Sequence, residues 1–270
     1  MHRFLERIYE QKLQSHIDES LEAAKQQSLP VYLKVLTKLH TKALSLKEAL
    51  QSIDMCQEPT LLTKLTDNLF CLHLPEDVYI RNEIRSLRVS YIEQLNQYYT
   101  SIGHMKPTNN PSTNLMGRMF DSLTVSKENE EVSGVPVSSE LALTFIYENK
   151  EALQRAKQLS PPEQIAENIE RIVDLLLKFL CVQHLDYALD VSLSKLMIHG
   201  PMRSTPALDV FETISKVNYV FHVLTTYFNT SVVPAVEGYF AITASVTDEK
   251  NAIAQTLQTK INSCLIRSLE

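Results

Sequence analysis

The chain has 270 residues, an apolar fraction of 44% and a formal net charge of −6. That length supports one or two domains with a sizeable core, and the apolar fraction is typical of globular proteins. Charges of both signs are interspersed, which disfavours a basic stripe for nucleic acid and a basic patch for a membrane surface. The charged, amphipathic amino terminus lacks the apolar core of a signal peptide.

Glycine and proline are confined to gaps between stretches with helical periodicity. Because both residues interrupt helices, this distribution predicts a row of long helices and an all-α fold class. Phosphate-binding loops, nucleophile elbows and dinucleotide folds all need glycine at tight turns, so the pattern also disfavours them. The five glycines are Gly103, Gly117, Gly134, Gly200 and Gly238.

Four helices are expected before residue 105. The first covers residues 3–27 and ends at Pro30, and the second covers residues 31–53. A shorter one covers residues 60–72, and the fourth opens at Pro75 and is closed by Gly103. Their apolar stripes are Leu5, Tyr9, Leu13, Ile17, Leu21 and Ala24; then Val35, Leu39, Ala43, Leu46 and Leu50; then Ile80, Ile84, Leu87, Tyr91, Leu95 and Tyr98.

Residues 106–137 differ in composition, because they are rich in Ser, Thr, Asn, Pro and Gly and show little periodicity. They predict a flexible linker between a helical bundle at residues 1–105 and a second bundle at residues 138–270. The final helix reaches Glu270 without a cap, so we expect the second bundle to be truncated there. An apolar island in the linker, residues 115–120, is either a docked short helix or a peptide that binds a partner.

The helices that follow the linker are longer. Ser138 or Ser139 can cap the first, and Pro161 opens the longest, in which Asp174 and Lys178 are placed to form a surface ion pair. This helix is apolar almost all round from residue 175 to 182, so we expect Leu180 to be a core residue. Two further helices carry stripes at Val210, Ile214, Val217, Phe221, Leu224 and Phe228, and, from about Ser245, at Ile253, Leu257, Ile261 and Leu265.

Chemically active arrangements are scarce. Cys56, Cys71, Cys181 and Cys264 are far apart and are expected to be reduced and buried. Cys181 and His184 lie one helical turn apart, but zinc needs three or four ligands and no second pair has matching spacing. We therefore predict no catalytic, cofactor-binding or metal-binding residue, no cofactor, and a protein that is not an enzyme.

Several segments resemble exocyst complex component 5, the Sec-ten subunit family, in its central-to-carboxyl-terminal part. The resemblance covers nearly the whole chain, and its segments occur in the family's order. They are Tyr9-Glu10-Gln11-Lys12-Leu13-Gln14-Ser15, Tyr91-Ile92-Glu93-Gln94-Leu95-Asn96-Gln97-Tyr98-Tyr99, Phe179-Leu180-Cys181-Val182-Gln183-His184-Leu185-Asp186-Tyr187-Ala188-Leu189-Asp190 and Val217-Asn218-Tyr219-Val220-Phe221-His222.

The resemblance implies stacked antiparallel helical bundles that form an elongated rod. It implies a non-enzymatic scaffold in the complex that tethers secretory vesicles to the plasma membrane before fusion. The implied partners are other exocyst subunits, especially exocyst complex component 6, and small GTPases of vesicles or endosomes, with no nucleic acid. The implied location is the cytoplasm, with recruitment to vesicles and plasma membrane through the complex only.

Two other readings stay open at this point. Subunits of Golgi or endosomal tethering complexes share the rod architecture. A helical regulator of small GTPases would need an exposed arginine, and Arg118 beside Gly117 is the residue in a suggestive setting.

Overall fold

The computed structural model describes residues 2–52, 59–75, 77–103, 135–199 and 205–269, and every regular element in these ranges is helical. The predicted all-α class is therefore confirmed. The elements before residue 102 are α1 (His2–Arg7), a π-helical turn (Ile8–Leu13), α2 (Gln14–Gln27), α3 (Leu29–Ser52), α4 (Pro59–Asn68) and α5 (Val78–Ser101). Those after residue 135 are α7 (Ser139–Leu159), a 3-10 turn (Pro162–Gln164), α8 (Ile165–Leu176), a π-helical segment (Leu177–Asp186), α9 (Tyr187–His199), α10 (Thr205–Tyr227), a π turn (Phe228–Val232), a 3-10 turn (Val233–Ala235) and α11 (Phe240–Leu269).

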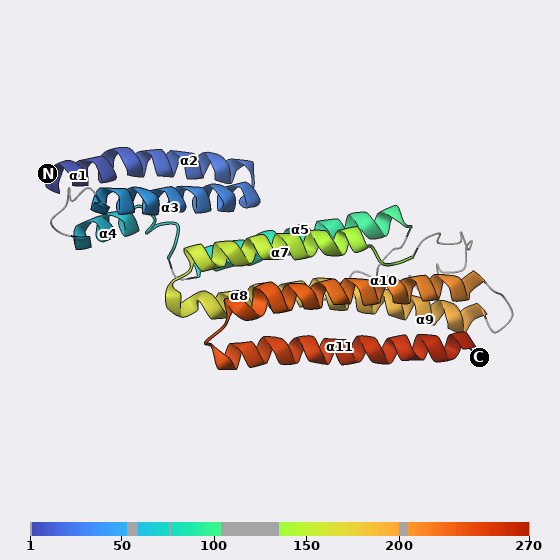
Figure 1. Ribbon diagram of the computed structural model, residues 1–270. Coiled ribbons are helices and arrows are strands. Elements are labelled where there is room, and N and C mark those ends of the chain that lie inside the picture. The colour runs from blue at the N-terminus through green and yellow to red at the C-terminus, as the bar shows by residue number, and fades with distance from the viewer. Residues whose placement is uncertain (1, 53–58, 76, 104–134, 200–204, 270) are drawn as a thin grey trace, which may run out of the picture.

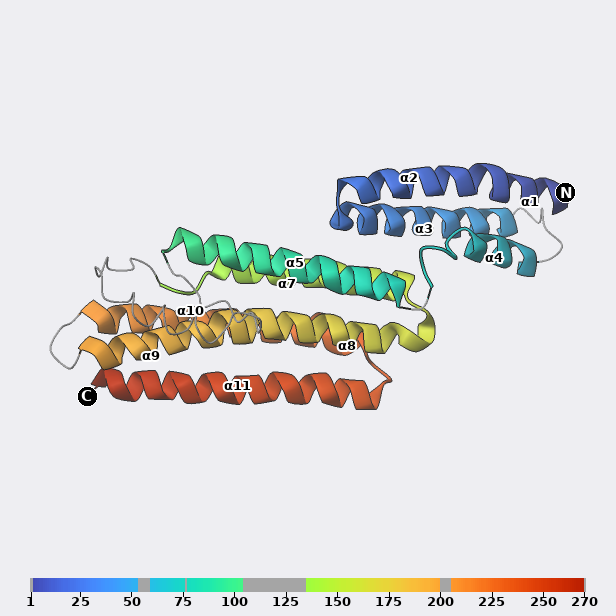
Figure 2. The same cartoon turned by 180° about the vertical axis from the view of Figure 1, so that it is seen from behind.

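These helices form two groups that are offset lengthwise, so the molecule is elongated (Figures 1 and 2). The first group, here called the arm (residues 2–68), is the antiparallel hairpin of α2 and α3 with α4 against α3. The second, here called the long bundle (residues 78–269), contains α5, α7, the continuous helix from α8 to α9, α10 and α11. The arm meets the long bundle where α3 contacts α5 and α7.

Helix α5 ends before residues 104–134 but packs against helices that follow them. We expect it to belong to the same bundle as the first three helices, but it packs on α7 and α8, and its main contact with the arm is α3. Tyr98 Oη donates a hydrogen bond to the carbonyl of Val135 (2.9 Å), and Val137 is buried. The rest of the predicted linker lies outside the described residues, as does the apolar island within it. The division into two domains therefore stays a prediction.

The predicted apolar stripes are mostly buried, with α3 as the exception. The stripe of α1 and α2 is confirmed at Leu5, Tyr9, Ile17, Leu21 and Ala24. In α3 the buried side chains are instead Tyr32, Leu33, Leu36 and Ala43, and Leu46 is exposed. Helix α3 packs against both α2 and α4. Two neighbours widen its buried face and shift it away from the single stripe that periodicity suggests.

Two helix boundaries differ from the prediction for local reasons. Pro30 lies in the first turn of α3, not in a gap, because a first-turn residue needs no intrahelical N–H bond. Helix α11 begins at Phe240, two residues after Gly238, whose φ of 94° ends the preceding segment. The cap of α7 is confirmed: the hydroxyl of Ser138 accepts a hydrogen bond from the N–H of Leu141 (3.2 Å).

The longest helix widens into π-helical turns at residues 177–186. Such turns contain more residues than α-helical turns and therefore shift which side chains face the core. Leu180, Cys181 and His184 are fully buried here, whereas Val182 is exposed. The prediction that Leu180 is a core residue is confirmed.

Candidate functional site

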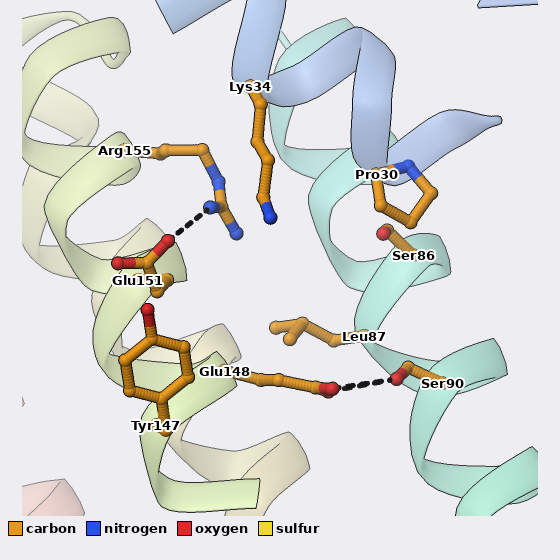
Figure 3. A pocket seen from close by; sticks show the side chains of 9 residues that line it. All are labelled: Pro30, Lys34, Ser86, Leu87, Ser90, Tyr147, Glu148, Glu151 and Arg155. Carbon is orange, nitrogen blue, oxygen red and sulfur yellow. Dashed lines mark hydrogen bonds and ion pairs between the residues drawn. The ribbon is translucent and has the colours of Figure 1, made fainter. Parts of the chain in front are cut away.

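A cleft of about 120 Å³ lies where the arm meets the long bundle (Figure 3). Helix α3 closes it from one side, and α5 and α7 form the other sides. It lies between the first turns of α3 and the turns of α5 and α7 that face them. Its lining residues are Pro30, Lys34, Ser86, Leu87, Ser90, Tyr147, Glu148, Glu151 and Arg155.

One wall of the cleft is held by a fixed carboxylate. The hydroxyl of Ser90 donates to both oxygens of Glu148 (2.9 and 3.1 Å), and Gln94 Nε2 donates to Glu148 Oε1 (2.8 Å). These bonds tie α7 to α5 and orient the carboxylate (Figure 3). Tyr147, next along α7, is 63% exposed.

The other wall contains a buried ion pair. Arg155 donates two hydrogen bonds to Glu83 of α5, from Nη2 (2.7 Å) and from Nε (3.0 Å), and Glu83 is fully buried. Tyr79 Oη donates to the same carboxylate (3.1 Å). Desolvation lowers the pKa of Arg155, but the hydrogen bonds and charge of Glu83 outweigh it, so the net shift is upward. The pair is bidentate, and the raised pKa keeps the Arg155 guanidinium protonated.

The residues of the cleft suit contact between helices better than catalysis. None of its lining residues is a histidine or a cysteine. Glu148 is committed to Ser90 and Gln94, and Arg155 is committed to Glu83. Lys34 is exposed and has no ion-pair partner among the described residues. No nucleophile with an adjacent base is assembled from these groups.

A second polar cluster lies inside the long bundle. Asn149 of α7 donates from Nδ2 to the carbonyl of Ile172 (2.9 Å), and its Oδ1 accepts from Tyr227 Oη (2.9 Å). Tyr91 Oη donates to the carbonyl of Phe145 (3.2 Å) close by. Burial raises the pKa of Tyr91 well above its usual range, so the phenol stays protonated and remains a donor. One amide thus links α7 to α8 and α10.

Cys181 and His184 both lie in the core of the long bundle. Desolvation raises the pKa of the buried Cys181 thiol far above its usual range, so burial favours the protonated thiol. His184 Nε2 accepts the N–H of Ser138 (3.1 Å), so the proton of the neutral ring lies on Nδ1, which donates to Tyr99 Oη (2.9 Å). Within the described ranges, no group of three or more His, Cys, Asp or Glu side chains could hold a metal ion.

Charged side chains join helix α11 to the rest of the long bundle, and one of them has a different partner from the one that the sequence predicted. Asp174 does not pair with Lys178; it hydrogen-bonds Glu249 of α11. Desolvation, followed by this bond and the charges of Glu249 and Glu170, raises the pKa of Asp174 to about 7. Lys260 of α11 bridges two other carboxylates, Asp186 (2.8 Å) and Asp190 (2.6 Å).

One prediction about a single residue is wrong, and two others concern residues outside the described ranges. Cys71 is exposed, because it follows the end of α4 in a turn, although we expected a buried thiol. Phe211 of α10 is 44% exposed, although its neighbour Val210 is buried. Cys56 and Arg118 lie outside the described residues.

The buried polar residues were missed although the sequence contained a signal for them. Glu83 lies between Ile80 and Leu87 on the apolar face of α5, and Asn149 lies on the apolar face of α7. A polar side chain at a stripe position predicts a buried partner. The identity of the partner was out of reach, because Arg155 is 72 residues from Glu83.

Among the described helices, none combines the length and the apolarity that a bilayer crossing requires. The fold and the cleft define a class of protein: an elongated rod of packed helices whose polar side chains hold helices together.

Comparison with known proteins narrows that class to one family. Residues 1–270 match the family described as exocyst complex component Sec10-like, alpha-helical bundle, and the chain belongs to that family. It is 29% identical over 279 residues to exocyst complex component 5 of Drosophila melanogaster, and 26% identical over 272 residues to those of Rattus norvegicus and Homo sapiens. These alignments include 99–100% of this chain but 38% of each relative's length. The resemblance to exocyst complex component 5 is confirmed.

Proposed function

We propose that this chain is a non-enzymatic scaffold segment of an exocyst subunit, which contributes to the tethering of secretory vesicles to the plasma membrane before fusion. The observation that supports this most is the family match across all 270 residues, together with the exocyst name of each relative. Other exocyst subunits are the proposed partners, exocyst complex component 6 first among them, and small GTPases of vesicles or endosomes follow.

The shape and chemistry of the chain support a mechanical role. A lengthwise succession of helices separates distant binding surfaces, and the buried bonds of Glu83, Asn149 and His184 resist sliding of one helix along another. A tether needs that resistance, because it transmits position between two membranes. We propose a cytoplasmic location, with recruitment to vesicles and plasma membrane through the complex.

The experiment that tests this function uses the tagged chain in cells, with capture of endogenous exocyst subunits and a secretion assay. We expect capture of exocyst subunits, and we expect a full-length subunit that lacks this segment to fail to restore secretion in cells depleted of their own. Capture of Golgi or endosomal tether subunits instead, with no exocyst subunit, would contradict the proposal.

A matched variant tests whether Cys181 and His184 have a chemical role. Cys181→Ala combined with His184→Gln keeps a side-chain acceptor for Ser138 but removes the thiol and the imidazole. We expect this variant to restore secretion when its thermal unfolding is near normal. Failure of a folded variant with intact exocyst assembly would reveal a chemical role.

A further inference from the structure

Helix α5 carries an exposed stripe that the fold leaves uncovered. Arg81, Arg85, Arg88 and Ile92 recur at intervals of four, three and four residues, which places them on one side of the helix. All four side chains are exposed, and Val89 lies beside them. The core residues of α5 and its contacts with α3 and α7 lie on other sides of the helix. We call these five residues the α5 stripe.

Among the described residues, no carboxylate pairs with the arginines of the α5 stripe. Arg81 Nε donates to the backbone carbonyl of Asp77 (3.2 Å), and neither Arg85 nor Arg88 forms an ion pair with any described residue. Helix α5 has two acidic residues: Glu83 is buried and already paired with Arg155, and Glu93 is exposed beside Ile92. A concentration of positive charge on one helix is unexpected in a chain whose net charge is −6.

The apolar members of the stripe point to a protein partner. Val89 and Ile92 are 47% and 42% exposed, next to the arginines. Arginine beside exposed aliphatic groups is typical of protein interfaces, because its planar guanidinium binds carboxylates in a bidentate manner and its stem packs on apolar surface. The stripe has no aromatic side chain for a bilayer interface, and the acidic chain as a whole disfavours anionic membranes.

We propose that the α5 stripe is a docking surface for an acidic amphipathic helix of another exocyst subunit. The inference rests on the proposed function for the source of the partner, but the surface itself follows from the structure. The stripe runs from Arg81 to Ile92, 12 residues or 11 steps along the helix, which is about 17 Å at 1.5 Å per step. A partner helix of about three turns covers that length, with carboxylates against the arginines and an apolar residue against Ile92. Figure 2 shows α5 in front of α7, on the side of the bundle from which such a helix would approach.

The test compares two charge reversals of equal size in the full chain. Arg85→Glu with Arg88→Glu changes the α5 stripe, and Lys150→Glu with Lys157→Glu changes two exposed cations on α7. We expect the first variant to lose captured exocyst subunits about tenfold, and the second to keep them. Thermal unfolding must be unchanged in both, and Ile92→Ala, which alters no charge, should weaken capture independently.

A photo-crosslinking residue at Ile92 identifies the occupant. We expect a cross-link to an acidic helical segment of an exocyst subunit, and arginines placed at its acidic positions should restore capture by the Arg85→Glu, Arg88→Glu variant. A cross-link within this chain, a dimer of this chain, or binding to phosphatidylserine vesicles that depends on these arginines would contradict the proposal. If the wild type and the stripe variant capture exocyst subunits equally, the proposed docking surface is contradicted but the proposed function is not. If the wild type captures no exocyst subunit, the proposed function is contradicted as well.

Discussion

The arm and the long bundle are built from similar helices, but different contacts hold them together. In the arm, α2, α3 and α4 meet through apolar side chains, and the hydrogen bond between Tyr32 Oη and His73 Nδ1 (3.2 Å) joins α3 to the turn that follows α4. In the long bundle, Glu83, Asn149 and His184 form buried polar links. Apolar contacts have no preferred direction, whereas hydrogen bonds have one. We conclude that polar links fix the relative positions of the helices in the long bundle, whereas apolar packing does so in the arm.

The largest effect is expected from Leu180, which no solvent reaches. Leu180→Asp places an unpaired charge in the core, and we expect the long bundle to lose cooperative unfolding. Leu180→Ala should cost about 2–5 kcal/mol. Hydrogen exchange, measured helix by helix, should show faster exchange in α5 and α7–α11 and unchanged exchange in α2 and α3. Simultaneous loss of protection in the arm would show that the two groups unfold as one unit.

The next effect concerns the ion pair between α5 and α7. Glu83→Met leaves Arg155 buried without its carboxylate partner, and Arg155→Met leaves Glu83 as an unpaired buried carboxylate. We expect each single change to cost about 3–5 kcal/mol in chemical denaturation. The double variant Glu83→Met, Arg155→Met should recover most of that loss, because both desolvated charges are gone. Costs that simply add would mean that the two residues act independently and that the pair does not join the helices.

A smaller loss is expected at the amide that links three helices. Asn149→Ala leaves the carbonyl of Ile172 and the hydroxyl of Tyr227 without their partner. We expect a cost of about 1–3 kcal/mol in the free energy of unfolding. The control is Tyr227→Phe, which removes one of these bonds and should cost less. A neutral Asn149→Ala would contradict the view that polar links specify the long bundle.

The two groups should respond to pH in opposite directions, beginning with the long bundle. The pKa of Asp174 is raised to about 7 in the folded protein, from its usual value of 3.8. The folded state therefore binds more protons than the unfolded state between these values, so this group's stabilising contribution is present at low pH and is lost as pH rises towards 7. We expect Asp174→Asn to remove that loss and to raise the urea midpoint at pH 8. An unchanged pH profile in this variant would show that Asp174 and Glu249 do not share a proton.

The smallest effect is expected in the arm. Burial, partly opposed by Asp67, lowers the pKa of His40 on α3 below its usual 6.5. Here the unfolded state binds more protons, so stability falls as pH decreases through about 6.5. His40→Leu should flatten this dependence in the arm, read by hydrogen exchange of α3 at pH 5.5 and 7.5, chosen about one unit either side of that value. A steeper dependence after the substitution would reverse the sign of this prediction.

Part of this protein followed from the sequence by itself. The all-α class, the burial of the stripes on α2, α5 and α10, the Ser138 cap and the burial of Leu180 all depend on local periodicity or on a single turn. Such local patterns can be recognised in a sequence. The family resemblance could be recognised for the same reason, because it consists of short helical segments in the family's order.

The rest was decided by tertiary structure. The partner of Glu83 lies 72 residues away. The hydrogen-bond partners of His184 come from α5 and from the start of α7. The buried face of α3 differs from the predicted stripe because α3 packs against two helices at once. The placement of α5 in the long bundle follows from the same contacts. Periodicity states which face of a helix is buried but not against what, because every apolar stripe is an acceptable neighbour for every other, and only packing in three dimensions selects among them.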